Sequence, residues 1–214
     1  MEDKSISIER IILGSSSQFR AQLLKQTGLE FHVEASDVNE ALVTHDMPCQ
    51  LALLRAEAKA LGVRSLRNKG SLVLGSDQVV ELDGTAYGKV ESKEEAFKRL
   101  ALFSGKTHQL HSAYALYCTD GAGQLVKCAL TCVTATIELK KLSEDDIHAY
   151  LDFDEWQGSS ACYYYEGRGI NLFKRVEGDY STIIGLPITD LLNDLNRLGI
   201  NSIRNPTGPW TIKV

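Results

Sequence analysis

The sequence predicts an α/β fold built on a mixed sheet, and two patterns support this. In the first half of the chain, short runs of strand composition alternate with amphipathic helical segments, which is the order of βα units. Residues 107–117 and 124–138 instead form two long alternating runs, and the turn sequence Thr119–Gly123 between them is typical of an antiparallel hairpin. A chain with both kinds of strand pairing is expected to form a mixed sheet.

The composition limits the function classes. With 214 residues and 43% hydrophobic content, the chain is long enough for one large domain or two small lobes, and we expect a single domain over residues 1–214. A formal net charge of −5 argues against a general nucleic-acid or membrane-surface binder, because those classes have a basic excess. No apolar run approaches the ~20 residues of a transmembrane helix. The polar segment Met1–Ser5 also lacks the apolar core of a signal peptide.

Cysteine usage favours a reduced, cytoplasmic protein. The five cysteines are an odd number without a CxxC pair, so the sequence suggests neither a disulfide framework nor a zinc knuckle. Cys128 and Cys132 lie four residues apart in an expected strand and therefore on one face, where ordinary packing explains them.

The N-terminal βα unit contains a candidate anion site. Arg10–Gly14 has strand composition, and the turn Ser15–Ser17 leads into a helix that ends at Gly28, with Ser17 as its N-cap. Backbone N–H groups and the helix dipole at such a start attract anions, and the guanidinium of Arg20, one turn later, suits phosphate. The alternative is an ordinary N-cap beside a surface arginine.

The next segments contain acidic and basic groups. After an alternating strand over residues 30–35, the loop Ser36–Glu40 has two carboxylates, which suit either a hard cation such as magnesium or a solvated turn. A helix with apolar residues at helical spacing is expected over residues 48–61. Arg55 and Lys59 lie at i and i+4 on that helix and share a face, which must be solvated or meet an anion.

The stretch Ser71–Leu82 is the centre of the expected sheet. Its apolar runs suit a strand buried on both faces, yet Gly75–Gln78 interrupts them. Burying the carboxylate of Asp77 is costly unless a charged or hydrogen-bonding group meets it, and Gly75 allows a ligand or another backbone to approach. Asp77 is therefore expected on the floor of a pocket. The alternative is a strand end with a solvated aspartate.

The second half of the chain continues the mixed pattern. Gly88–Lys89 places a lysine beside a flexible glycine, and Ser159–Gly169 is either a loop that approaches a ligand or an aromatic strand edge. No pattern is visible in the tail 199–214. The remaining expected elements are a helix over 91–103, a helix starting at Ser143, a strand over 170–176, a turn over 178–181 and a final helix over 188–198.

Eight segments form a set with a characteristic order and spacing. They are Leu13–Arg20, Ser36–Glu40, Arg55–Ala60, Gly75–Val80, Gly88–Lys89, Ser104–Gly105, Glu166–Gly169 and Gly178–Pro187. Together they cover about residues 10–198, and in this order the chain resembles the Maf-type nucleotide pyrophosphatases. The resemblance implies a two-lobed α/β fold like that of inosine triphosphate pyrophosphatases, with a cleft between the lobes. It also implies metal-dependent hydrolysis of nucleoside triphosphates to monophosphate and pyrophosphate, often by a homodimer.

The resemblance also implies the roles of individual residues. A triphosphate brings about four negative charges into a cleft, so cations must line it and a water must be oriented for attack. The resemblance assigns the role of general base to Asp77. It also implies that Asp77 and Glu40 together hold a divalent cation, magnesium or manganese. The implied catalytic residues are Asp77, Lys59, Lys89 and Glu40, and the implied phosphate-binding residues are Ser15, Ser17 and Arg20.

Three positions depart from the commoner family pattern. Phe19 replaces an arginine, Gln78 a threonine and Glu166 a glutamine, and these residues resemble the branch that acts on 7-methylguanosine triphosphate. The usual branch acts on thymidine and uridine triphosphates. Methylation at N7 makes guanine cationic, which favours an aromatic face and a nearby carboxylate. Gln18 and Val90 also stand where prolines are usual.

Two other function classes stay open. One is a weakly catalytic nucleotide sensor, linked to cell division, that uses the same pocket. The other is a thiol enzyme, although no cysteine has a recognisable partner histidine and third group. In the favoured interpretation the partner is a small-molecule nucleotide, with no nucleic-acid polymer and no membrane.

Overall fold

The computed structural model describes residues 5–214, and the expectation about the start of the chain rests on residues 1–4, which lie outside the described residues. The strands are β1 (Ser5–Ile8), β2 (Arg10–Gly14), β3 (His32–Val33), β4 (Ser71–Leu82), β5 (Thr85–Tyr87), β6 (Thr107–Thr119), β7 (Leu125–Leu139), β8 (Phe173–Glu177) and β9 (Trp210–Lys213). The α-helices are α1 (Gln18–Gln26), α2 (Pro48–Leu61), α3 (Lys93–Phe103), α4 (Glu144–Leu151), α5 (Tyr180–Ile184) and α6 (Ile188–Leu198). Short 3-10 helices are η1 (Glu40–Leu42), η2 (Arg64–Arg67) and η3 (Arg168–Leu172).

The strands form the expected mixed sheet. Within residues 5–214, seven strands make one sheet in the order β3-β2-β4-β6-β7-β8, with β5 added beside β4. β2 is parallel to β3 and β4, whereas β4, β6, β7 and β8 pair antiparallel. β1 and β9 form a separate antiparallel pair. The βα pattern and the long hairpin of the sequence are therefore both confirmed.

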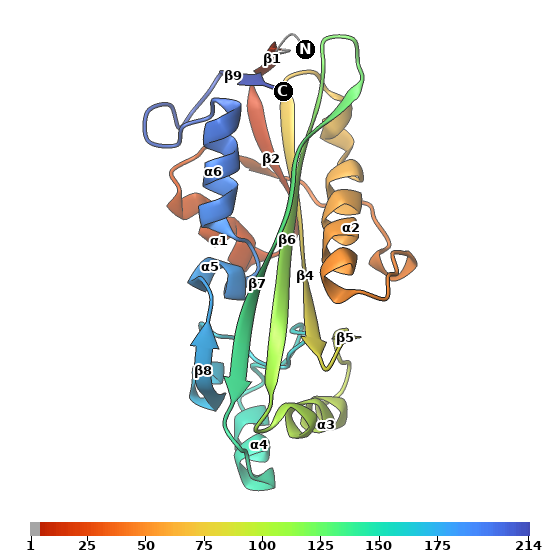
Figure 1. The fold of residues 1–214 in the computed structure, drawn as a ribbon, viewed down its shortest axis with the longest axis vertical. Helices are drawn as coiled ribbons and strands as arrows, with labels where there is room; N and C mark the ends of the chain where they lie inside the picture. The colour runs from red at the N-terminus through yellow and green to blue at the C-terminus, as the bar shows by residue number, and fades with distance from the viewer. Residues whose placement is uncertain (1–4) are drawn as a thin grey trace.

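The fold has two lobes that share the long strands β4, β6 and β7 (Figure 1). The first lobe contains α1, α2 and α6 around one half of these strands, and the second contains α3 and α4 at the other end. Buried apolar side chains fill both faces of the sheet in the first lobe, under α6 and under α2, and a separate cluster fills the second lobe. Each lobe thus has its own core.

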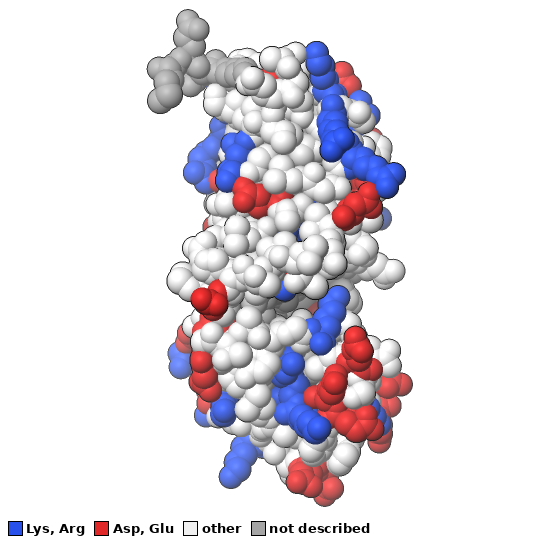
Figure 2. Space-filling model, turned by 90° about the vertical axis from the view of Figure 1, so that its right-hand side faces the viewer, with Lys and Arg blue, Asp and Glu red and all other residues white. Residues whose placement is uncertain are grey.

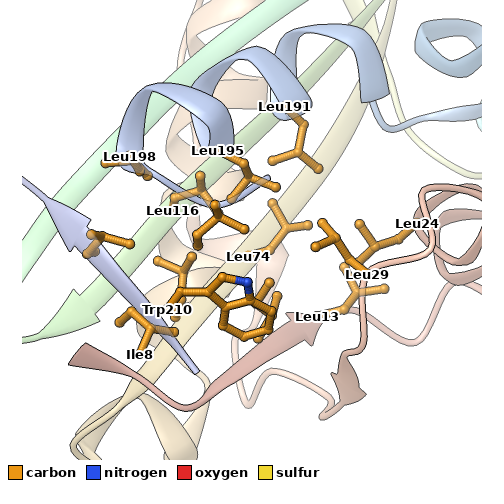
Figure 3. Close-up of a cluster of buried hydrophobic side chains, with 14 of the residues drawn as sticks. Ile8, Leu13, Leu24, Leu29, Leu74, Leu116, Leu191, Leu195, Leu198 and Trp210 are labelled. Carbon is orange, nitrogen blue, oxygen red and sulfur yellow. The ribbon is translucent and has the colours of Figure 1, made fainter. Parts of the chain in front are cut away.

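The core under α6 includes the two ends of the described chain. Ile8 of β1 is fully buried, and Trp210 of β9 packs with it beside Leu13 and Leu195 (Figure 3). The alternation of buried and exposed residues in β1 and β9 orients their apolar side chains into this core. The tail that showed no pattern in the sequence therefore contributes a strand.

The sheet has a gap beside the middle of β4. β2 pairs with β4 only from Ser71 to Gly75, and β5 pairs with it only from Val80 onward. The intervening edge of β4 thus has no strand beside it in the described part of the chain. Because successive side chains point to opposite faces of a strand, the gap presents groups from both faces of the sheet at one place.

Gly75 allows α2 to contact the sheet directly. A Cβ atom at this position would lie 2.3 Å from the carbonyl oxygen of Ala56 and 2.3 Å from the amide nitrogen of Ala60. The sequence left open whether a ligand or another backbone approaches Gly75, and in the structure it is the backbone of α2. The close contact fixes the height of α2 above β4 and so positions Lys59 over the neighbouring Asp77.

Several expected elements differ from the structure. The strand expected over 170–176 begins only at Phe173, because Arg168–Leu172 forms η3. The turn expected over 178–181 leads directly into α5, which Gly185 ends in a left-handed conformation with φ 117°. The strand expected over 30–35 shortens to His32–Val33.

The expected common face of Cys128 and Cys132 is wrong. The register between β6 and β7 shifts at Leu116 and Tyr117, so Cys128 lies within a bulge. Cys128 packs against the core under α6 and Cys132 against the core under α2. An extra residue in a strand reverses the alternation beyond it, which four-residue spacing alone does not reveal.

No helix among residues 5–214 is both long enough and apolar enough to cross a membrane.

Candidate active site

A cleft of about 750 Å³ opens at the gap in the sheet, with residues of both lobes in its wall. Figure 2 shows the face on the α2 side, where a mostly uncharged band crosses the middle between two more highly charged ends. The structure brings every predicted site residue to this cleft. They are Ser15, Ser17, Phe19, Arg20, Glu40, Lys59, Asp77, Gln78, Lys89 and Glu166.

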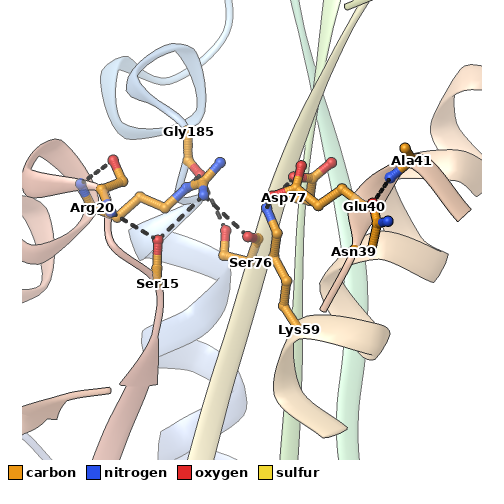
Figure 4. Close-up of polar contacts among 10 residues, drawn as sticks. Ser15, Arg20, Asn39, Glu40, Ala41, Lys59, Ser76, Asp77 and Gly185 are labelled. Carbon is orange, nitrogen blue, oxygen red and sulfur yellow. Dashed lines mark hydrogen bonds and ion pairs between the residues drawn. The ribbon is translucent and has the colours of Figure 1, made fainter. Parts of the chain in front are cut away.

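Asp77 and Lys59 form the centre of the cleft. Asp77 is only 4% exposed, which excludes the alternative of a solvated aspartate. Lys59 Nζ lies 2.5 Å from Asp77 Oδ1 and 2.9 Å from Glu40 Oε1, so one ammonium group joins two carboxylates (Figure 4). Glu40 is the first residue of η1, and the side chain of Asn39 caps this helix by accepting a hydrogen bond of 3.1 Å from Ala41 N.

The two carboxylates fit a divalent cation. Asp77 Oδ2 is buried and has no hydrogen-bond partner among the described residues, whereas half of the Glu40 side chain is exposed to the cleft. A buried carboxylate oxygen without a partner costs free energy unless water or a cation meets it. Carboxylate oxygens are also the ligands that magnesium and manganese prefer. Asp77 and Glu40 are therefore the residues that would hold the expected metal.

The charges around Glu40 determine its ionisation. Burial by itself raises the pKa of Glu40, but the hydrogen bond from Lys59 and the positive charges of Lys59, Lys89 and Arg55 outweigh burial. The pKa of Glu40 consequently lies below its ordinary value, and the carboxylate is ionised at neutral pH. Because Lys89 and Arg55 contribute to the lowered pKa of Glu40, their positive charges also belong to the electrostatic environment of the cleft.

The serine turn and Arg20 form one wall of the cleft. Ser17 is the N-cap of α1 and accepts a hydrogen bond of 3.4 Å from Arg20 N, as the sequence predicts. The guanidinium of Arg20 donates to Gly185 O at 2.9 Å, to Ser76 O at 3.1 Å and to Ser15 Oγ at 3.4 Å. Arg20 therefore joins α1 to β4 and to the end of α5, in addition to lining the cleft.

The electrostatic setting of Arg20 follows from its position. Burial lowers the pKa of Arg20, and the negative charges of Asp77 and Glu40 oppose this effect. An arginine in such a position stays protonated at every physiological pH. It is a fixed positive charge beside the serine turn, and it is not the free surface arginine of the alternative interpretation.

Aromatic rings and a carboxylate also line the cleft. The rings of Phe19 and Tyr164 lie 5.2 Å apart between centroids and are tilted by 37°. Glu166 lies at the rim and is exposed to solvent. Partial burial of its carboxyl group nevertheless raises the pKa of this group. A flat cationic ring placed here would meet aromatic faces and a carboxylate.

Gln78 makes contacts within the protein. Its Nε2 lies 2.8 Å from Ser112 Oγ, 3.0 Å from Thr182 O and 3.0 Å from Ile183 O. These acceptors use both hydrogens of the amide, so a ligand can meet only the Oε1 acceptor of Gln78. The side chain therefore supports the end of α5 against the sheet.

Arg55 and Tyr164 line the cleft, although sequence reasoning assigned neither of them to the site. Arg55 lines it and has a buried Nε without a hydrogen-bond partner among the described residues. Its i, i+4 relation to Lys59 was the available signal. Tyr164 was visible only as part of an aromatic run. Asp37, the other carboxylate of the acidic loop, pairs with Arg64 at 2.8 Å on the surface and does not line the cleft.

Known proteins resemble this chain over most of its length. The family model described as Maf-like protein matches residues 10–198. A protein of Bartonella quintana (strain Toulouse) named 7-methyl-GTP pyrophosphatase is 41% identical over 198 residues, which cover 90% of this chain and 97% of that protein. A dTTP/UTP pyrophosphatase of Geobacter sulfurreducens is 31% identical over 190 residues, covering 89% of this chain and 97% of that protein. The structure of the Staphylococcus aureus Ham1 protein aligns with a TM-score of 0.39 at 17% identity, covering 62% of this chain and 72% of that one.

Proposed function

The chain belongs to the Maf-like protein family, and from this premise we propose that it hydrolyses a nucleoside triphosphate to the nucleoside monophosphate and pyrophosphate. The observation that supports this most directly is the buried carboxylate of Asp77, with one oxygen bonded to Lys59 and the other without a partner among the described residues. A carboxylate held in this way can accept a proton from a water molecule in the cleft.

The proposed reaction takes place at the α-phosphorus. The water oxygen forms a bond to this phosphorus while Asp77 Oδ2 accepts the water proton. The bond from the α-phosphorus to the bridging oxygen then breaks, and pyrophosphate leaves with the electron pair. Lys59 holds Oδ1, so only Oδ2 is available for the water.

The other charged groups bind and orient the phosphates. Phosphoryl transfer depends mainly on positioning and on neutralising charge. We assign the phosphates to the Ser15–Ser17 turn, Lys89 and Arg55, with Arg20 as a fixed charge that also maintains the turn. Magnesium or manganese held by Asp77 and Glu40 would supply further charge neutralisation when bound.

The base end of the cleft supports 7-methylguanosine triphosphate as the substrate. A methylated guanine carries a positive charge, and Phe19 with Tyr164 provides aromatic faces of the kind that attract cations. The raised pKa of Glu166 shows that its negative charge is incompletely solvated, so a cationic ring beside it replaces the missing solvation. The relative from Bartonella quintana has a name that specifies the same nucleotide.

The test is a hydrolysis assay with a panel of ordinary and modified nucleoside triphosphates at matched metal concentration and pH. The proposal expects monophosphate and pyrophosphate as the products. Turnover of thymidine or uridine triphosphate in preference to the methylated nucleotide would assign the chain to the other substrate class of its relatives. Binding without turnover of any nucleotide would instead indicate a sensor. We also propose that the protein is cytoplasmic and forms a homodimer. Gel filtration with light scattering tests the homodimer.

A further inference from the structure

Three potential metal ligands meet under the start of α2, outside the cleft. They are Cys49 in the first turn of α2, His111 on β6 and Cys132 on β7, and one ligand atom from each lies within 4.8 Å of the others. His111 pairs with Thr134, and Cys132 pairs with Ala113, two residues further along β6. His111 and Cys132 are therefore diagonal neighbours on one face of the hairpin, the face that α2 covers.

The imidazole of His111 is already oriented for metal binding. Its Nε2 lies 2.6 Å from Glu81 Oε2, and its Nδ1 lies 2.9 Å from Thr134 Oγ1. An ionised carboxylate only accepts, so Nε2 must hold a proton, and Nδ1 has the lone pair of the neutral ring. A carboxylate that accepts from the far nitrogen of a metal-binding histidine is the usual arrangement at zinc sites.

We propose that Cys49, His111 and Cys132 form a binding site for a zinc ion or a similarly thiophilic divalent metal. Two thiolates and one imidazole make a soft donor set, unlike the carboxylates of the cleft. Bond lengths of about 2.3 Å to sulfur and about 2.0 Å to nitrogen place tetrahedral ligand atoms roughly 3.5–3.8 Å apart, so donors that lie within 4.8 Å of one another need to close by about 1.3 Å at most. The metal takes the place of the Thr134 hydroxyl at Nδ1.

The surroundings allow a metal to enter. Cys49 and Cys132 are only partly buried, which leaves a route for the ion and a fourth position for water or an external ligand. Burial and a hydrogen bond with Cys49 raise the pKa of the Cys132 thiol, so metal binding must displace protons from sulfur. The two sulfur atoms, one from α2 and one from β7, lie within 4.8 Å of one another.

The proposed site is distinct from the cleft along the same helix. Cys49 precedes Lys59 by ten residues of α2, a rise of about 15 Å. Because a metal there would connect the start of α2 to the hairpin, it would secure the helix that presents Arg55 and Lys59 to the cleft. Its presence does not depend on the proposed hydrolysis.

The decisive experiment is a cobalt titration of the reduced, metal-free full-length protein. We expect one equivalent of cobalt to produce a thiolate-to-cobalt charge-transfer band, and zinc to abolish the band by displacement. Cobalt bound to the carboxylates of the cleft produces no such band, so the cleft does not interfere. Cys49→Ser and Cys132→Ser should each lose the band.

The matched control is Cys128→Ser, because Cys128 lies on the same strand but on the other face, 3.5 Å from Cys118 between sulfur atoms. It should keep the band and the stoichiometry. Glu81→Gln should bind cobalt about 10–100-fold more weakly, since it weakens the support of His111 without removing a ligand. Circular dichroism checks folding, and if Cys132→Ser is misfolded, Cys49→Ser and His111→Gln decide. Absence of the band in the reduced wild-type protein, or its persistence in folded Cys49→Ser, would overturn the proposal.

Discussion

Lys59 Nζ lies 2.5 Å from Oδ1 of Asp77, and this ion pair connects α2 to the centre of β4. Both side chains are largely buried, at 12% and 6% exposure. The contact occupies one carboxylate oxygen and leaves the other, Oδ2, buried without a partner among the described residues. The two oxygens of Asp77 thus have different roles, one in holding the helix and one in the chemistry.

Asp77→Asn should abolish hydrolysis while the protein stays folded. The amide keeps the shape of the side chain but cannot accept the water proton, and loss of a general base costs on the order of a hundredfold or more in kcat. The measurement is steady-state turnover, with circular dichroism as the check on folding. Asp83→Asn is the matched control, since Asp83 lies exposed in the turn after β4 and outside the cleft. A variant at Asp77 with most of its turnover would refute the assignment.

Activity should require a divalent cation, and the cation should act through Glu40 and Asp77. Chelator should stop the reaction, and magnesium or manganese should restore it with pyrophosphate as the product. Glu40→Gln should raise the metal concentration needed for half-maximal activity, because one charged oxygen ligand is lost. Release of orthophosphate and a nucleoside diphosphate would point to a γ-phosphatase instead.

The methylated base should be preferred over thymidine triphosphate and unmodified guanosine triphosphate. A cation over an aromatic ring contributes about 0.5–2 kcal/mol and a charge-assisted hydrogen bond roughly 1.5–3 kcal/mol, which together allow a preference of about tenfold to a thousandfold in kcat/KM. Phe19→Arg with Glu166→Gln should reduce this ratio. Glu30→Gln, exposed and outside the cleft, should leave it unchanged. A higher kcat/KM for thymidine triphosphate in the wild type would contradict the argument.

The stability contribution of Glu40 should depend on pH in a defined direction. Its pKa is depressed in the folded protein from an ordinary value of 4.5, so its ionised form stabilises the fold above that pH. The contribution is lost as pH falls from that value through the depressed pKa. The difference in urea midpoint between wild type and Glu40→Gln should therefore be larger at pH 7 than at about pH 3. An equal difference at both values would show that the ion pair with Lys59 does not stabilise the fold.

Gly75→Ala should destabilise the protein by about 1–3 kcal/mol, because the new methyl group overlaps the backbone of α2. Urea unfolding at neutral pH measures the change. Gly121→Ala is the control, since a Cβ atom there meets nothing within 4 Å. If Gly75→Ala matches that control in stability, α2 is not held at the height that the structure indicates. Activity should fall with stability, because the same shift displaces Lys59.

The sequence predicted those parts of the fold that local patterns determine. The central strand over 71–82, the helix over 48–61 and the last helix over 188–198 were all predicted with the bounds that the structure shows. The two helices have apolar residues at helical spacing, and the strand has apolar runs that end before a turn sequence. The β1–β9 pair was not predicted, because its two strands are short and each finds its partner only at the other end of the chain.

The sequence predicted which residues belong to the candidate site but not how they are arranged in space. The motifs identified the predicted residues that line the cleft. The gap in the sheet beside β4, where Asp77 and Gln78 lie on opposite faces, depends instead on where β2 ends and β5 begins. The position of Tyr164 depends on how the loop between α4 and η3 folds, and no local sequence pattern predicts that loop. The bulge at Cys128 likewise depends on the pairing of two strands and reverses the expected face of the cysteines.

The pairing of β1 with β9 determines when folding can finish during synthesis. Ser5 pairs with Lys213 and Ile8 with Trp210, so β1 leaves the ribosome long before the strand with which it pairs (Figure 1). The hairpin of β6 and β7 is local and can form while the rest of the chain is being made. The core around Ile8 is complete only after Trp210 has been synthesised. A nascent chain arrested before residue 210 therefore still exposes an apolar surface, to which chaperones can bind.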